Sequence, residues 1–399
     1  MNSFCRILWA AICILPLALP LHAQNQTDDR FPGLPYYSYG DGLGWTTPDS
    51  TYQLNMRFRM QNRATYSNYD GQEESVEMLV RRLRLRFDGF VGDPRFLYAI
   101  QLSFAPGDVG TLRDGGNINI IRDAVVYYRP SRHWNIGFGQ TKLPGNRQRI
   151  NSSGALQLTD RSINNALFNI DRDFGLQVYY LNEDTGSFPY NLKTAVSTGE
   201  GRNWTDQNDA NLAYTARLEL MPLGSFQRRG MFFEGDIVRE ETPKLLFGGT
   251  WHYNHQARRV QGQQGAVLAE PADLTSILLD AMLKYQGWSF QSAWMTRRTD
   301  FPVAVAGPPF VMAGSGTDLQ LSYLFPSDYE LIGRFSTQTP APEIEAFMPQ
   351  REQYTFGITR YIWEHALKIQ TELTYDVRSF PGTGSENGWY LRFQVEFGI

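Results

Sequence analysis

Six arginines recur at alternate positions along two successive segments of the chain. They are Arg57, Arg59, Arg63, Arg82, Arg84 and Arg86. A guanidinium group offers a planar fork of hydrogen-bond donors that matches phosphate and carboxylate oxygens. If the two segments pair about a turn near Asp70 and Gly71, Arg57 lies opposite Arg86, and Arg59 lies opposite Arg84. Like charges directly opposed on a sheet are destabilising, so this arrangement requires water or bound anions beside it.

A second group of charged residues lies in the longest irregular stretch, residues 142–173. The group comprises Arg147, Arg149, Asp160 and Arg161. A loop of this length without regular structure is usually either functional or disordered. Its apolar residues, among them Leu156 and Phe168, are too many for a disordered segment, so we expect it to pack against the rest of the fold.

Alternating apolar and polar residues identify the elements that carry these side chains. The last eleven residues alternate strictly, with Leu391, Phe393 and Val395 on one face and Arg392 and Gln394 on the other. Similar runs recur along the chain with turn residues between them, and this is the period of β-strands. The sixteen predicted strands cover about 52–64, 79–91, 95–104, 119–129, 134–142, 174–181, 190–199, 211–221, 244–254, 276–286, 288–297, 316–325, 329–338, 353–362, 366–376 and 389–399.

The connections between these strands are alternately short and long. This alternation is typical of bacterial outer-membrane barrels, in which short periplasmic turns alternate with long extracellular loops. A run near residues 231–239 would add a seventeenth strand, but it is too charged to face lipid, and we assign 222–243 to one long connection. The fold class is therefore an all-β, transmembrane antiparallel barrel of sixteen strands. Residues 142–173 follow the fifth strand, so we expect an inward-folded third extracellular loop, with an external cap as the alternative.

The first residues indicate the compartment. Arg6 precedes an apolar stretch that is too short to span a bilayer, and Ala23 offers a cleavage site. We therefore predict a cleaved signal peptide at 1–23, a periplasmic leader of irregular structure at 24–50 and the outer-membrane barrel at 51–399. Both cysteines fall within the predicted signal peptide, which leaves the mature chain without disulfides or thiolate metal sites.

Composition and motifs exclude several classes of protein. The mature chain would carry 36 basic and 41 acidic residues, which argues against a nucleic-acid partner. No Gly-x-Ser-x-Gly motif accompanies the four mature histidines, which we interpret as surface residues, so an enzyme or a metal site is not supported. No cofactor is expected. The 32 arginines far outnumber the 5 lysines, so the basic chemistry is almost entirely that of guanidinium.

Several motifs, in their order and spacing, resemble the phosphate-selective porin O and P family in its Bacteroidetes-type form. The resemblance extends from about Thr47 over nearly the whole mature chain. The clearest matches are Arg81-Arg-Leu-Arg-Leu-Arg-Phe-Asp-Gly89, Gly139-Gln-Thr-Lys-Leu-Pro144, Arg172-Asp-Phe-Gly175 and Phe233-Glu-Gly-Asp236. The resemblance implies a sixteen-stranded homotrimeric porin that admits anions, in some members phosphate or polyphosphate. The lysine clusters of the phosphate-selective members are largely missing here.

The residues leave more than one function open. An arginine-lined lumen would favour small anions, because rings of charged side chains set the selectivity of a pore. The alternative is an unselective general porin, in which inward carboxylates oppose the arginines across the lumen. An outer-membrane receptor or adhesin and a barrel enzyme are further alternatives. The expected partners are small anionic solutes, outer-membrane lipid with lipopolysaccharide, and two further copies of the chain.

Overall fold

A computed structural model describes residues 42–109, 120–183, 188–203, 210–300, 309–382 and 384–399. All of them belong to one unit, Leu34–Ile399. The predicted signal peptide and residues 24–41 of the predicted leader lie outside the described residues. Among the described residues, no helix is both long and apolar enough to cross a membrane.

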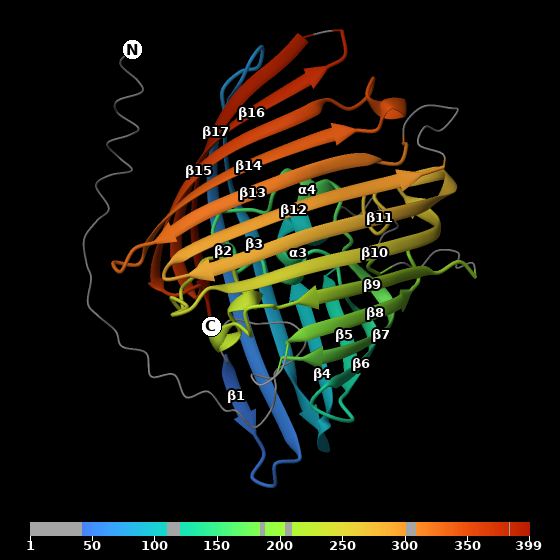
Figure 1. The fold of residues 1–399 in the computed structure, drawn as a ribbon, viewed down its shortest axis with the longest axis vertical. Coiled ribbons are helices and arrows are strands. Elements are labelled where there is room, and N and C mark those ends of the chain that lie inside the picture. Colours follow the sequence, from blue (N-terminus) through green and yellow to red (C-terminus); the bar gives the residue numbers. More distant parts are fainter. Residues whose placement is uncertain (1–41, 110–119, 184–187, 204–209, 301–308, 383) are drawn as a thin grey trace. The chain divides into compact units, whose positions relative to one another are not determined.

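Sixteen strands form a single closed antiparallel sheet (Figure 1). Each strand pairs with its neighbours in sequence, and β17 pairs with β2 from Gly388 opposite Tyr69 to Gly398 opposite Arg59. The prediction of a sixteen-stranded barrel is therefore confirmed. The strands are β2 Tyr52–Tyr69, β3 Ser75–Val91, β4 Asp93–Ser103, β5 Ile121–Tyr128, β6 Trp134–Lys142, β7 Arg172–Asn182, β8 Tyr190–Ser197, β9 Ala213–Leu220, β10 Lys244–Arg259, β11 Val267–Tyr285, β12 Trp288–Thr299, β13 Gly314–Leu324, β14 Tyr329–Pro340, β15 Gln350–Trp363, β16 Leu367–Phe380 and β17 Gly384–Gly398.

A short additional strand, β1 (Leu43–Thr46), pairs with the first residues of β2, from Leu43 opposite Met56 to Thr46 opposite Gln53. It uses the part of the β2 edge that β17 does not reach. The expectation of an irregular leader is therefore wrong for residues 43–46, which gain backbone hydrogen bonds that an open sheet edge would lack.

Exposure alternates along the strands in the sense opposite to that of a soluble protein. Apolar side chains such as Leu218, Leu279 and Leu321 face outward and are about half exposed, while their neighbours Arg217 and Asp280 are buried. An outward apolar band around a polar interior is what a barrel needs when lipid surrounds it. The arrangement explains why a chain with a mean hydropathy of −0.39 can be a membrane protein.

The barrel has two ends, which we name by what they carry. The terminal end holds the start of β2, the end of β17 and tight turns such as Gln286-Gly287; the loop end holds the hairpin near Asp70 and most of the long connections. Short helices occur in the connections. They are α2 (Pro106–Val109), α3 (Arg147–Ile150), α4 (Ile163–Leu167) and the 3-10 helices η1 (Gln227–Phe232) and η2 (Pro342–Ile344).

Candidate functional site

The connection between β6 and β7, residues 143–171, is called the inserted loop here. Its side chains and backbone bond to inward residues on strands all around the barrel. These residues are Arg59 on β2, Arg84 on β3, Glu219 on β9, Thr250 on β10, Arg297 on β12, Asp318 on β13, Arg334 on β14 and Glu372 on β16. Contacts on so many sides place the loop inside the barrel, where Figure 1 shows its helices α3 and α4.

Local signals in the sequence hold the inserted loop in shape. Asn146 caps α3 by accepting from the backbone N–H of Arg149, and Ser162 caps α4 by accepting from that of Asn165. Apolar residues of the loop, including Leu143 and Phe168, pack on inward residues of the wall such as Leu278. These contacts explain why the loop is rich in apolar residues, the feature from which we predicted that it packs against the rest of the fold.

The six arginines predicted to line the pore are called the arginine wall. They lie on β2 and β3, and the register places Arg57 opposite Arg86 and Arg59 opposite Arg84, as the sequence predicts. None is more than about one-sixth exposed at its side chain. The repulsion between these paired cations must be offset by neighbouring acceptors.

The first pair of opposed arginines shares one carboxylate. Arg57 Nη1 and Arg86 Nε both contact Asp88 Oδ1, the second at 3.0 Å. Asp88 is only 2% exposed and lies on β3 beside Arg86. One negative charge therefore partly neutralises two positive ones.

The second pair contacts hydroxyl groups of the inserted loop. Arg59 donates to Ser152 Oγ at 2.8 Å and to Ser153 Oγ at 2.9 Å, and Arg84 donates to Ser153 Oγ at 2.9 Å. Arg84 also pairs with Asp108 of α2 at 2.6 Å. Burial raises the pKa of Asp108, but Arg84 and a second guanidinium, that of Arg122, outweigh this and hold the pKa far below its usual range.

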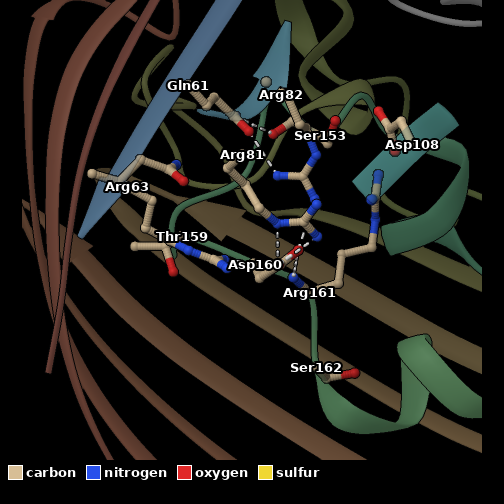
Figure 2. Close-up of polar contacts among 12 residues, drawn as sticks. Gln61, Arg63, Arg81, Arg82, Asp108, Ser153, Thr159, Asp160, Arg161 and Ser162 are labelled. Atoms are coloured by element: carbon tan, nitrogen blue, oxygen red, sulfur yellow. Dashed lines mark hydrogen bonds and ion pairs between the residues drawn. The ribbon is translucent and has the colours of Figure 1, made fainter. Parts of the chain in front are cut away.

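The remaining members of the arginine wall converge on Asp160 of the inserted loop (Figure 2). Arg82 and Arg81 each approach a carboxylate oxygen of Asp160 to 2.8 Å, and Arg63 approaches to 3.2 Å. Burial raises the pKa of Asp160, but the three guanidinium groups outweigh this and hold the pKa well below the usual value. Asp160 therefore carries its charge at any physiological pH.

Arg81 is a site residue that strict alternation misses. Gln61 pairs with Arg82 and Asn62 pairs with Val80, so Arg81 is the extra, unpaired residue of a β-bulge. The bulge turns Arg81 to the same carboxylate as Arg82, although adjacent residues of a regular strand point to opposite faces. The doubled arginine at positions 81 and 82 is the available sequence signal, since one of the two would otherwise face lipid.

The other arginines predicted for the inserted loop anchor it. Arg147 pairs with Glu219 on β9, and Arg149 pairs with Asp171 at 2.6 Å. Arg161 donates to the backbone oxygens of Gln148 and Asn151, both at 2.8 Å. Of the four predicted loop residues, Asp160 and Arg147 therefore contact the wall, while Arg149 and Arg161 hold the loop together.

A second segment enters the barrel from the terminal end. The connection between β9 and β10, residues 221–243, is not a strand, as predicted from its charge. Its residues Phe226, Met231 and Phe232 form a buried apolar cluster with Met282 of β11. Lys284, which is fully buried on β11, donates to the backbone oxygens of Gly230 and Phe233 of this terminal-end segment. The sequence did not lead us to predict that this segment folds inward.

The inserted loop and the terminal-end segment meet at Glu234. Its backbone N–H donates to the oxygen of Ala155 at 2.8 Å. Its carboxylate accepts from the backbone N–H of Gln157 at 2.9 Å and from Gln148 Nε2 at 3.0 Å. Two connections from opposite ends of the barrel are thus joined within it.

Inward carboxylates on other strands are also engaged. Asp280 pairs with Arg217 at 2.7 Å, and Glu372 pairs with Arg392 at 3.3 Å. Glu330 accepts from the hydroxyl of Tyr361 at 2.5 Å. The interior therefore has cations and carboxylates on several strands, and most of those described are paired within the protein.

The described histidines occupy both buried and exposed positions. His252 and His365 are 2% exposed, so the expectation that they lie at the surface is wrong; His252 forms hydrogen bonds with Thr215 and Gln263 within the barrel. His255 is exposed on the opposite face of β10, as its odd spacing predicts. Over the described part of the chain, no group of three or more His, Cys, Asp or Glu side chains could hold a metal ion.

The chain is similar to known proteins in sequence and in fold. The sequence profile of a family described as phosphate-selective porin O and P matches residues 54–319. No curated protein sequence matches the chain.

Solved structures of outer-membrane channels share the fold. The channel DcaP of Acinetobacter baumannii has a TM-score of 0.58 at 12% identity, covering 89% of this chain and 99% of that chain. OmpF of Salmonella typhi, in complex with daunomycin, has a TM-score of 0.54 at 11% identity, covering 88% and 100%. OprB of Pseudomonas putida has a TM-score of 0.54 at 8% identity, covering 88% and 95%. At these identities the similarity concerns the fold alone.

Proposed function

Because the chain belongs to the phosphate-selective porin O and P family, we propose that its arginine wall gives an outer-membrane channel a preference for small anions. The family and the fold support an outer-membrane channel through which small solutes diffuse. The anion preference is our proposal, with hydrated chloride, phosphate and organic anions as the solute class.

The cluster at Asp160 is the observation that carries the proposal. Three guanidinium groups, those of Arg63, Arg81 and Arg82, converge on this carboxylate, and the only other carboxylate paired with them among the described residues is that of the exposed Glu77, 3.9 Å from Arg63. The positive charge in excess at this point of a narrow, low-dielectric passage attracts anions more strongly than the acidic net charge of the chain repels them. Guanidinium is also weakly hydrated and suited to oxyanions.

An unselective general porin is the second candidate. It is favoured by the pairing of inward charges elsewhere, such as Asp280 with Arg217 and Glu372 with Arg392. Paired charges produce a local field but little net potential, and a passage lined by them would discriminate weakly between ions.

The reversal potential in a KCl gradient separates the two candidates. The purified protein is inserted into a planar bilayer, and the zero-current potential is measured with more concentrated salt on one side. An anion-selective channel gives the sign expected for chloride, and an unselective one gives a potential near zero. A potential of the sign expected for potassium would contradict the proposed anion preference.

Orientation, processing and assembly belong to the same proposal. The terminal end would face the periplasm and the loop end the exterior, after cleavage of residues 1–23. The outward apolar band would contact lipid and, at the loop end, lipopolysaccharide. A homotrimer is proposed from family membership; native mass spectrometry of the detergent-solubilised protein tests it, and a purely monomeric species would contradict it.

A further inference from the structure

Lys368 of β16 is a cation that lies fully buried inside the barrel. Its ammonium group donates to the backbone oxygens of Gly154 and Leu156 in the inserted loop, at 2.9 and 2.6 Å. It also lies 3.1 Å from Nδ1 of His365, whose Nε2 is 3.0 Å from the backbone oxygen of Glu234. Since that oxygen can only accept, Nε2 carries the proton and Nδ1 accepts from Lys368. These neutral partners take the three ammonium hydrogens, so the charge must be balanced by a carboxylate nearby.

That carboxylate belongs to Glu396 of β17, which lies between two cations. Its Oε2 is 3.3 Å from Nζ of Lys368, and its Oε1 is 3.8 Å from Nε of Arg59. Glu396 is 1% exposed, and a buried carboxylate is costly unless a cation pairs with it. Lys368 and Arg59 therefore share one negative charge, and the carboxylate lies nearer to Lys368.

Arg59 and Glu396 could form a closer contact than the one they make. Among the described residues, neither Nε of Arg59 nor either carboxylate oxygen of Glu396 has a hydrogen-bond partner. A separation of 3.8 Å is too long for a hydrogen bond. The other nitrogens of the Arg59 guanidinium donate to Ser152 and Ser153, so Nε is the donor that faces Glu396. A donor and an acceptor that could pair are thus held apart.

The backbone of the inserted loop passes close to this contact at Gly154. A β-carbon at position 154 would overlap Nη1 of Arg59 and Oε1 of Glu396. Because glycine has no side chain, both charged groups pack against the loop, while Lys368 bonds to the backbone oxygen of the same residue. The three charged residues therefore meet at one point of the inserted loop.

The other charged groups that face these residues have partners elsewhere. Those that act most strongly on Lys368 or Arg59 are Glu234, Arg82, Asp108 and Arg172. Glu234 accepts from the backbone N–H of Gln157, and Asp108 pairs with Arg84 at 2.6 Å. Over the part of the chain that the structure describes, none of the four forms an ion pair with Lys368 or Arg59, so Glu396 is the carboxylate that joins them.

We propose that Lys368 is a positioning residue for the arginine wall, an inference that rests on the proposed function of the channel. Its ammonium group holds Glu396 at a distance from Arg59, whose side chain is 15% exposed and carries its charge beside the passage. Without that group, Glu396 would turn to Nε of Arg59 and form a charge-assisted hydrogen bond. One cation of the wall would then be neutralised, although Lys368 itself is too deeply buried to contact a solute.

A purely structural role for Lys368 is the alternative, because its bonds also hold the inserted loop. Gln370 provides the matched control. It lies two residues along β16 on the same face, is 1% exposed, and donates to the backbone oxygens of Leu156 at 3.3 Å and Gln157 at 2.8 Å. Gln370→Met therefore removes neutral bonds from the same stretch of loop and leaves Glu396 with its two cations.

Reversal potentials in a KCl gradient test the proposal. Lys368→Met removes the charge with little change in side-chain length. It should lower the permeability ratio of chloride to potassium by roughly twofold to threefold, because a charge beside the passage is lost. Gln370→Met should change the ratio by less than about 1.5-fold. Equal shifts in the two variants would overturn the proposal, since Lys368 would then act only as an anchor of the loop.

The variant Glu396→Gln shows whether Lys368 acts through Glu396. In that background no carboxylate can turn to Arg59, so the addition of Lys368→Met should change the ratio by less than about 1.5-fold. A shift as large as that of Lys368→Met alone would mean that the ammonium charge acts directly on the ions, and it would overturn the positioning role.

The crystal structure of Lys368→Met gives a measurement that does not depend on ion selectivity. A carboxylate oxygen of Glu396 should lie within about 3.2 Å of Nε of Arg59. A separation that stays near 3.8 Å would overturn the inference. A wild-type reversal potential of the sign expected for potassium would instead contradict the proposed anion preference, and the shorter contact in the variant would still be expected.

Resistance to SDS at room temperature shows that each variant has folded. Lys368→Gln is the second variant, because its amide keeps two donors for the loop but carries no charge. It should shift the permeability ratio in the same direction as Lys368→Met and show the same contact between Glu396 and Arg59. A wild-type ratio in folded Lys368→Gln would overturn the proposal.

Discussion

The carboxylate of Asp160, on a loop inside the barrel, lies 2.8 Å from the guanidinium of Arg82 on the barrel wall. Arg63 and Arg81 contact the same carboxylate. Asp160 therefore acts as a tethered counter-ion, occupying the position that a dissolved anion would otherwise take among these arginines.

Replacement of Asp160 by Asn should increase anion selectivity. Asn keeps the shape and one acceptor oxygen but removes the charge that neutralises the cluster. We expect the permeability ratio of chloride to potassium to rise by roughly twofold to fivefold near 0.1 M salt, where the Debye length is about 10 Å. Asp328→Asn is the matched control, because Asp328 lies in an exposed turn beside Arg360. An equal shift in both variants would show that the position of Asp160 is not special.

The contact at Asp160 should be insensitive to pH over a wide interval. A carboxylate whose pKa is depressed by folding stabilises the folded state above its unfolded pKa, and this stabilisation disappears only as the pH falls through the depressed folded value. The contribution of Asp160 to selectivity should therefore stay constant between about pH 8 and about pH 4, the unfolded value for Asp. A change in selectivity near pH 5 to 6 that occurs in the wild type but not in Asp160→Asn would show that the pKa of Asp160 is not lowered.

Removal of charge from the second arginine pair should have the opposite effect to Asp160→Asn. In the double variant Arg59→Gln, Arg84→Gln each side chain keeps a polar amide but loses the positive charge that faces Ser152 and Ser153. The permeability ratio should shift toward cations, most clearly at about 0.01 M salt, where the Debye length is about 30 Å. Arg95→Gln is the control, because Arg95 forms an exposed ion pair with Asp93 at the start of β4, and it should leave the ratio unchanged.

Deletion of most of the inserted loop should widen the passage. Without residues 146–168 the lumen loses the segment that bonds to strands around it, and single-channel conductance should increase. Deletion of residues 224–241 should also increase it, because the terminal-end segment occupies the same interior. Since the two meet at Glu234, the effects should not be additive. Wild-type conductance in either folded deletion variant would mean that the segment does not restrict the passage.

The sequence predicts the strands and the pairing of the arginines because both depend on alternation. For each of the sixteen strands, the boundary at the terminal end of the barrel is predicted to within a few residues. At the loop end of the barrel, several strands extend further than predicted. β11, for example, begins at Val267 where the pattern predicts about 276. Beyond the bilayer both faces of a hairpin meet water, and alternation then no longer distinguishes them.

The contacts inside the barrel could not be predicted in the same way. The partners of Arg84 and Arg82, Asp108 and Asp160, lie on connections whose position depends on how they fold into the interior. The charge of the terminal-end segment identifies it as a connection, yet no local signal indicates that Glu234 meets the inserted loop. Such contacts join residues far apart in sequence, and the register of a hairpin carries no information about them.

Gly248 of β10 lies between Glu219 of β9 and Asp280 of β11, and this placement has an evolutionary consequence. A β-carbon at position 248 would overlap both the guanidinium of Arg217 and the carboxylate of Asp280, which form an ion pair there. The three positions are therefore expected to change together during divergence: a lineage that loses the ion pair frees position 248 to carry alanine, whereas a lineage that keeps the pair retains the glycine.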